Sequence, residues 1–137
     1  ARVIVVPTVG SPYSHRGVEL ACRLSEEQHA EILLVYVIEV PRTLPLGAPL
    51  EHAEQEAGKA LETAREVVEL HQLPARTIVQ RAREAATGII DAAKAHHADL
   101  IVLGLGPHRD RSHIWGRTAD ALLRRAPCEV IFDKLPE

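Results

Sequence analysis

Three glycines and a group of basic residues follow an apolar run near the C-terminus, and together they could bind an anion. The run Leu100–Leu103 predicts a strand buried on both faces. Gly104 and Gly106 come next, and a helix is expected to begin near Gly116. Glycine lets the main chain adopt positive φ and approach a ligand closely, while a helix N-terminus carries partial positive charge. Backbone N–H groups here could therefore hold a phosphate, although such turns are also glycine-rich for purely steric reasons.

The residues between the last two glycines are charged. The basic side chains are His108, Arg109, Arg111 and His113, and Asp110 opposes them. A cluster of this kind attracts anions. It is equally typical of a solvated loop, because charged residues usually lie on the protein surface. The loop alone therefore leaves both interpretations open.

The sequence contains no set of side chains with the composition of a catalytic centre. Ser11 precedes Pro12 and is better explained as a helix cap, and Ser112 lacks the context of a nucleophile elbow. Cys22 is expected on a buried helix face, and Cys128 at a strand entrance, so both are expected to be packed rather than reactive. A Walker-type lysine is absent, which argues against vigorous nucleotide hydrolysis. We therefore expect a protein that is not an enzyme.

The histidines do not predict a metal site. His96 and His97 are adjacent, whereas two ligands on one helix face need a spacing of three or four residues. His52 and His71 lie about five turns apart on one expected helix. We therefore expect no bound metal.

Apolar periodicity predicts alternating strands and helices. The expected strands are residues 3–6, 32–38, 75–81, 100–103 and 128–132, and the expected helices lie at about residues 12–29, 50–73, 85–97 and 115–125. Four strands are continuous apolar runs or nearly so, but 75–81 alternates polar with apolar residues, as a strand at a sheet edge does. The order predicts an α/β fold, in which helices cover both faces of one doubly wound parallel sheet.

Ligands of such sheets bind beyond the carboxyl ends of the strands. If the first and fourth strands are neighbours, residues 7–11 and 104–118 border one crevice. The binding candidates are Pro7, Thr8, Val9, Val37, Gly104, Gly106, His108, Arg109, Gly116, Arg117 and Thr118. A proline-rich segment, residues 41–49, is the expected mobile loop, either a lid over this crevice or a slack connection.

Composition limits the class of protein. A chain of 137 residues is the size of a single domain, here taken as residues 1–137. A net charge of −3 and 3% aromatic residues argue against nucleic acid as a partner. Two cysteines favour the reducing cytoplasm.

The sequence lacks a run of about 20 apolar residues and a signal peptide, so no membrane insertion is expected. Because the chain lacks methionine, we expect it to be processed or cut from a larger protein such as a transporter or kinase.

Four segments resemble the universal stress protein family over nearly the whole chain. They are VIVVPTVGS, AEILLVYVIE, ADLIVLG and GRTADALLRRAPCEVIF. The resemblance implies a five-stranded parallel sheet of flavodoxin-like order 3-2-1-4-5. It also implies a homodimer formed through the final strand, Cys128–Phe132, and one branch of the family binds ATP.

The sequence departs from the ATP-binding branch at three places. In that branch, an aspartate ends the first strand, and the later loop reads Gly, two residues, Gly, nine residues, Gly and then Ser or Thr. Here Val9 occupies the aspartate position, one residue instead of two separates Gly104 from Gly106, and Arg117 occupies the hydroxyl position. Valine cannot accept a hydrogen bond from a nucleoside, which costs about 1–3 kcal/mol of binding.

The sequence therefore favours a dimeric regulatory module without catalysis in which ATP binding is weakened or lost. The alternative is a sensor of ATP, AMP or another phosphorylated ligand. In that case Arg117 would replace the lost hydroxyl through a charge-assisted hydrogen bond.

Overall fold

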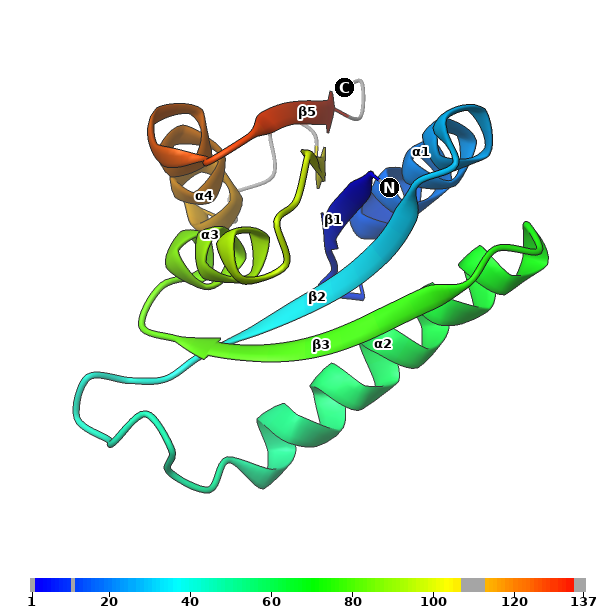
Figure 1. The fold of residues 1–137 in the computed structure, drawn as a ribbon. Coiled ribbons are helices and arrows are strands. Elements are labelled where there is room, and N and C mark those ends of the chain that lie inside the picture. The colour runs from blue at the N-terminus through cyan, green and yellow to red at the C-terminus, as the bar shows by residue number, and fades with distance from the viewer. Residues whose placement is uncertain (1, 11, 107–112, 135–137) are drawn as a thin grey trace.

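The computed structural model describes residues 2–10, 12–106 and 113–134. Strands and helices alternate along the chain (Figure 1). The strands are β1 (Val3–Pro7), β2 (Glu31–Glu39), β3 (Ala75–Ala82), β4 (Leu100–Leu105) and β5 (Glu129–Lys134). The helices are α1 (Pro12–Gln28), α2 (Glu51–Leu70), α3 (Ala85–Ala95) and α4 (His113–Arg125).

The five strands form one parallel sheet in the order β3-β2-β1-β4-β5. This confirms the predicted fold class and strand order, and β3 lies at a sheet edge as its alternating pattern indicates. Val5 of β1 pairs with Leu33 of β2 on one side and with Ile101 of β4 on the other. The carboxyl ends of β1, β2 and β4 therefore lie along one edge of the sheet.

Among the described residues, the two larger hydrophobic clusters lie on opposite faces of the sheet. Ile4 and Val6 point toward α1 and α2, whereas Val5 points toward α3 and α4. Figure 1 shows the corresponding layers, with α1 and α2 over one face and α3 and α4 over the other. Because both faces are covered, the central strands consist of apolar residues without alternation.

Three helices are followed by a residue other than glycine that has a positive φ. His29, Gln72 and His97 have φ of 55°, 59° and 53°, the left-handed conformation that commonly closes a helix. After α2, the N–H of Gln72 donates to the carbonyl of Glu69 and the N–H of Leu73 to that of Val68. The helix therefore ends at Leu70 and not at residue 73 as predicted, and the Leu70 side chain is 84% exposed.

Two arginines hold the proline-rich segment 41–49, one near the end of β3 and one directly after it. Arg81 donates to the carbonyls of Leu46 and Ala48 at 2.8 and 2.7 Å. Arg83 donates to the carbonyls of Pro41 and Leu44 at 2.7 and 2.8 Å. The loop carbonyls thus have defined partners, and the mobility of the loop stays a prediction.

Candidate functional site

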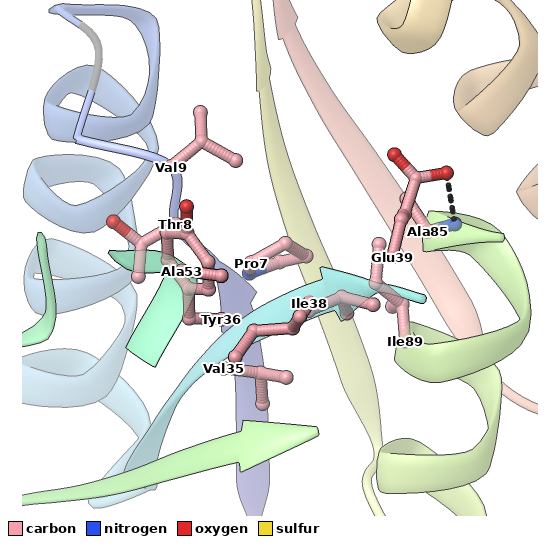
Figure 2. Close-up of a pocket in the computed structure, with 11 residues that line it drawn as sticks. Pro7, Thr8, Val9, Val35, Tyr36, Ile38, Glu39, Ala53, Ala85 and Ile89 are labelled. Atoms are coloured by element: carbon pink, nitrogen blue, oxygen red, sulfur yellow. Dashed lines mark hydrogen bonds between the residues drawn. The ribbon is translucent and has the colours of Figure 1, made fainter. Parts of the chain in front are cut away.

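A cavity of about 310 Å³ opens at the carboxyl end of β2, and we call it the cleft cavity. Its walls come from β1, β2, α2 and α3 (Figure 2). The lining residues are Pro7, Thr8, Val9, Val35, Tyr36, Val37, Ile38, Glu39, Ala53, Ala85 and Ile89. Most of these side chains are apolar, so the cavity suits an apolar group with few polar contacts.

The alternation of β2 places side chains of the cavity on both sides of the strand. Tyr36 packs with the α2 side of the sheet, and Val35 and Val37 pack with the α3 side. Burial raises the pKa of the Tyr36 hydroxyl, and the nearby Glu56 raises it further. Tyr36 therefore stays a neutral phenol at physiological pH, able to donate or accept a hydrogen bond.

The end of β1 contributes an apolar side chain and a buried hydroxyl. Val9 is 40% exposed, and its N–H donates to the Ser14 hydroxyl at 3.0 Å. Thr8 is buried, and its Oγ1 makes no hydrogen bond to any described residue. A buried hydroxyl without a partner is costly, so a polar group of a ligand or a water molecule would be stabilised beside Thr8.

A second cavity, of about 350 Å³, adjoins the first, and we call it the arginine cavity. It is lined by Glu39, Arg42, Arg83, Glu84, Ala85, Ala86, Arg117 and Thr118. The two cavities share Glu39 and Ala85. Figure 2 shows the Glu39 carboxylate, which accepts a hydrogen bond from the N–H of Ala85 at 3.2 Å.

The structure divides the predicted site residues among several places. Pro7, Thr8, Val9 and Val37 line the cleft cavity, whereas Arg117 and Thr118 line the arginine cavity. Gly104 lies inside β4, Gly106 follows that strand, and Gly116 lies in α4. His108 and Arg109 lie outside the described residues. A ligand role for any of these residues stays a prediction.

Most lining residues of the two cavities were not predicted from the sequence, among them Glu39, Arg42, Arg83 and Ala85. Glu39 ends β2, and Arg83 directly follows β3. The rule that ligands bind beyond the carboxyl ends of strands could have indicated these two residues. Arg42 belongs to an irregular loop, and its position depends on the tertiary structure.

Comparisons with known proteins show the family to which the chain belongs. Residues 1–134 match the sequence pattern of the Universal stress protein family. The chain belongs to the universal stress protein family. A universal stress protein of Methanocaldococcus jannaschii is 28% identical over 141 residues, which cover 98% of this chain and 82% of that protein.

Solved structures of the universal stress protein family have the same fold. A family member from Burkholderia pseudomallei has a TM-score of 0.76 and 23% identity, with 95% of this chain and 93% of that chain covered. The Archaeoglobus fulgidus protein in complex with dAMP has a TM-score of 0.76 and 17% identity, with 96% and 95% covered. The Arabidopsis thaliana protein with AMP bound has a TM-score of 0.73 and 14% identity, with 98% and 92% covered.

A helix that crosses a bilayer needs about 20 predominantly apolar residues. Within residues 2–10, 12–106 and 113–134, none of the helices combines the length and the apolar character needed to cross a membrane.

Proposed function

We propose that this protein is a regulatory module that binds a small ligand in the cleft cavity without catalysing its conversion, and that its affinity for ATP is weak. The observation that carries the proposal is the valine at the end of β1. Val9 lines the cleft cavity with an apolar, 40% exposed side chain. The aspartate that the ATP-binding branch has at this position would accept hydrogen bonds from a nucleoside. Valine contributes none, so one specific contact is lost.

The cleft cavity favours a ligand with a flat apolar part. Its volume of about 310 Å³ lies at the lower end of the range for small-molecule sites. The wall consists largely of proline, valine, isoleucine and alanine, while the buried Thr8 hydroxyl offers one polar partner. The nucleotides bound by two of the structural neighbours, dAMP and AMP, combine a flat base with one phosphate, which supports the same class of ligand here.

The chemistry of the lining residues supports binding rather than catalysis. Tyr36 is held neutral by its raised pKa, and one oxygen of Glu39 already accepts from the N–H of Ala85. The described residues that line the two cavities include no cysteine, serine, lysine or histidine, which are common nucleophiles and bases of enzymes. Ligand binding would therefore act through a change of shape or partner rather than through a reaction.

Isothermal titration calorimetry with ATP, AMP and adenosine tests the proposal. We expect ATP to bind the natural chain with a dissociation constant in the millimolar range or weaker. Val9→Asp should strengthen ATP binding about tenfold, the equivalent of one hydrogen bond to a charged group. Val79→Asp is the matched control, because Val79 is 41% exposed but lies in β3 and lines neither cavity. Micromolar binding of ATP to the natural chain would contradict the proposal.

A second candidate is a sensor of ATP, AMP or another phosphorylated ligand that uses Arg117. The supporting observation is that Arg117 and Thr118 line a cavity next to the cleft. In this case AMP should bind more tightly than adenosine, and Arg117→Gln should remove the difference.

We further propose a homodimer formed through β5. This strand is at the edge of the sheet, and its apolar residues Val130, Ile131 and Phe132 are only half-buried. An edge strand can pair with a second copy of itself and remove the exposed edge. Sedimentation velocity should give a dimer mass, and a monomer mass at high protein concentration would exclude this interface.

A further inference from the structure

Charged residues from four parts of the chain line the arginine cavity. Arg42 comes from the loop after β2, Arg83 from the turn before α3, and Arg117 from α4. Glu39 and Glu84 are the two acidic residues of its lining. Three guanidinium groups and two carboxylates leave one net positive charge. A cavity of this kind attracts a small anion.

The arginines are only partly neutralised. Arg42 pairs with Glu84 at 3.5 Å, but both side chains are exposed and such a pair is weak. Arg83 is fixed by the carbonyls of Val40, Pro41 and Leu44, which position its charge without cancelling it. Arg117 forms no ion pair with a described residue. The guanidinium groups of Arg83 and Arg117 therefore remain available to an anion.

The N-terminus of α3 borders the same cavity. Ala85 and Ala86 are lining residues, and Glu84 at the N-cap makes no side-chain cap. The N–H of Ala85 donates instead to Glu39, at a rather long 3.2 Å (Figure 2). The helix N-terminus favours negative charge. A carboxylate of the chain itself thus occupies the position that an anionic ligand would use.

We propose that the arginine cavity binds the phosphate of a phosphate monoester, and that Glu39 competes with this phosphate for the N-terminus of α3. The apolar part of the same ligand would lie in the cleft cavity, which shares Glu39 and Ala85 with the arginine cavity; this part rests on the proposed function. A monoester carries a charge of about −1.5 to −2 at neutral pH, which the cavity and the helix can balance. A triphosphate brings more negative charge than they offset.

This assignment differs from a phosphate site on the glycines after β4. Gly104 has a steric reason to be glycine, because a Cβ there would lie 1.9 Å from the Tyr13 carbonyl oxygen. The arginine cavity instead uses residues of the β2–α2 loop, the β3–α3 turn and α4. Its phosphate would lie on the α3 side of the cleft.

Titration of the full chain with inorganic phosphate, followed by backbone amide NMR at constant ionic strength, tests the site without any apolar ligand part. We expect phosphate to shift the amide signals of Ala85 and Ala86. Arg117→Gln should weaken phosphate binding about tenfold. Arg124→Gln is the matched control, because it removes the same charge from the same helix outside the cavity. Glu39→Gln, which keeps the side-chain shape, should strengthen binding several-fold.

The outcomes separate this inference from the proposed function. If AMP and adenosine fail to bind while phosphate still shifts Ala85 and Ala86, the anion site stands and the proposed function falls. Three results would overturn the anion site. The first is that phosphate leaves the amide signals of Ala85 and Ala86 unshifted. The second is that Arg117→Gln and Arg124→Gln weaken phosphate binding equally. The third is that Glu39→Gln binds phosphate more weakly than the natural chain.

Discussion

Gly104 of β4 lies directly against the Tyr13 carbonyl of α1. A Cβ at Gly104 would come within 1.9 Å of that carbonyl oxygen and within 2.7 Å of its carbon. Gly17, one turn further along α1, faces the backbone N of Gly104, with 3.1 Å available to a Cβ. These two glycines let α1 and β4 approach more closely than side chains would permit.

Gly104→Ala should therefore destabilise the protein by about 3 kcal/mol, because backbone atoms must move to admit the methyl group. Gly58→Ala is the control. Gly58 lies within α2, and a Cβ there meets no atom within 4 Å. This change should stabilise the protein by about 1 kcal/mol, the difference in helix propensity. Urea unfolding of both variants measures the two effects, and a stable Gly104→Ala variant would show that α1 can move away from β4.

The contact between Gly104 and Tyr13 illustrates which features of the fold can be predicted from the sequence and which cannot. Apolar runs such as Leu100–Leu103 predict buried parallel strands, and the alternation in 75–81 correctly indicates an edge. The sequence also predicts that the main chain at Gly104 approaches another group closely. It does not predict that this group is the Tyr13 carbonyl, because that contact depends on the packing of two distant segments. Arg42 and Arg83 are typical surface residues in the sequence, and only the fold brings them to one cavity with Arg117.

Gln72, which follows α2, allows the cost of its left-handed backbone conformation to be measured. Gln72 adopts a φ of 59°, which glycine tolerates better than glutamine. Gln72→Gly should stabilise the protein by about 0.5–1 kcal/mol, because it removes the steric cost of the left-handed conformation. Gln80→Gly is the contrasting variant, since Gln80 lies in β3 and glycine weakens a strand interior. Thermal unfolding should show opposite shifts of Tm for the two variants.

The attachment of the proline-rich loop depends on Arg81. Its guanidinium donates to the carbonyls of Leu46 and Ala48 and pairs with Glu54 at 3.4 Å. Arg81→Gln should accelerate hydrogen exchange of the loop 41–49 several-fold and destabilise the whole protein by about 1–2 kcal/mol. Arg76→Gln is the control, because Arg76 also lies in β3 but pairs with Glu31 far from the loop. Unchanged exchange in Arg81→Gln would show that the loop is held by other contacts.

Cys22 should resist thiol reagents in the folded protein. Burial, together with the nearby carboxylates of Glu19 and Glu26, raises the pKa of its thiol to about 12. The reactive thiolate is therefore almost absent at neutral pH. In a Cys128→Ser background, a disulfide reagent should label Cys22 only after urea unfolds the chain. Rapid labelling without urea would mean that α1 opens locally and exposes this thiol.

His71 connects α1 and α2 through two carboxylates. Its Nε2 lies 2.8 Å from a Glu19 oxygen, and its Nδ1 lies 3.2 Å from a Glu26 oxygen. Ionised carboxylates only accept hydrogen bonds, so both contacts are hydrogen bonds only when both ring nitrogens carry protons and the ring is an imidazolium. The hydrogen bond to Glu19 is the main cause that raises the pKa of His71 above 6.5, and Glu26 adds to it.

The raised pKa makes this connection sensitive to pH in one direction. Its stabilisation is complete below the unfolded pKa, near 6.5, and is lost as the pH rises through the higher folded pKa. The two contacts together should contribute about 1 kcal/mol, because the carboxylates are half-exposed. Urea unfolding should therefore show that the natural chain exceeds His71→Gln in stability at about pH 6 and that the difference shrinks toward about pH 9. Glu19→Gln with Glu26→Gln should remove the same pH dependence. A difference that stays constant over this range would mean that His71 contributes by packing and not by charge.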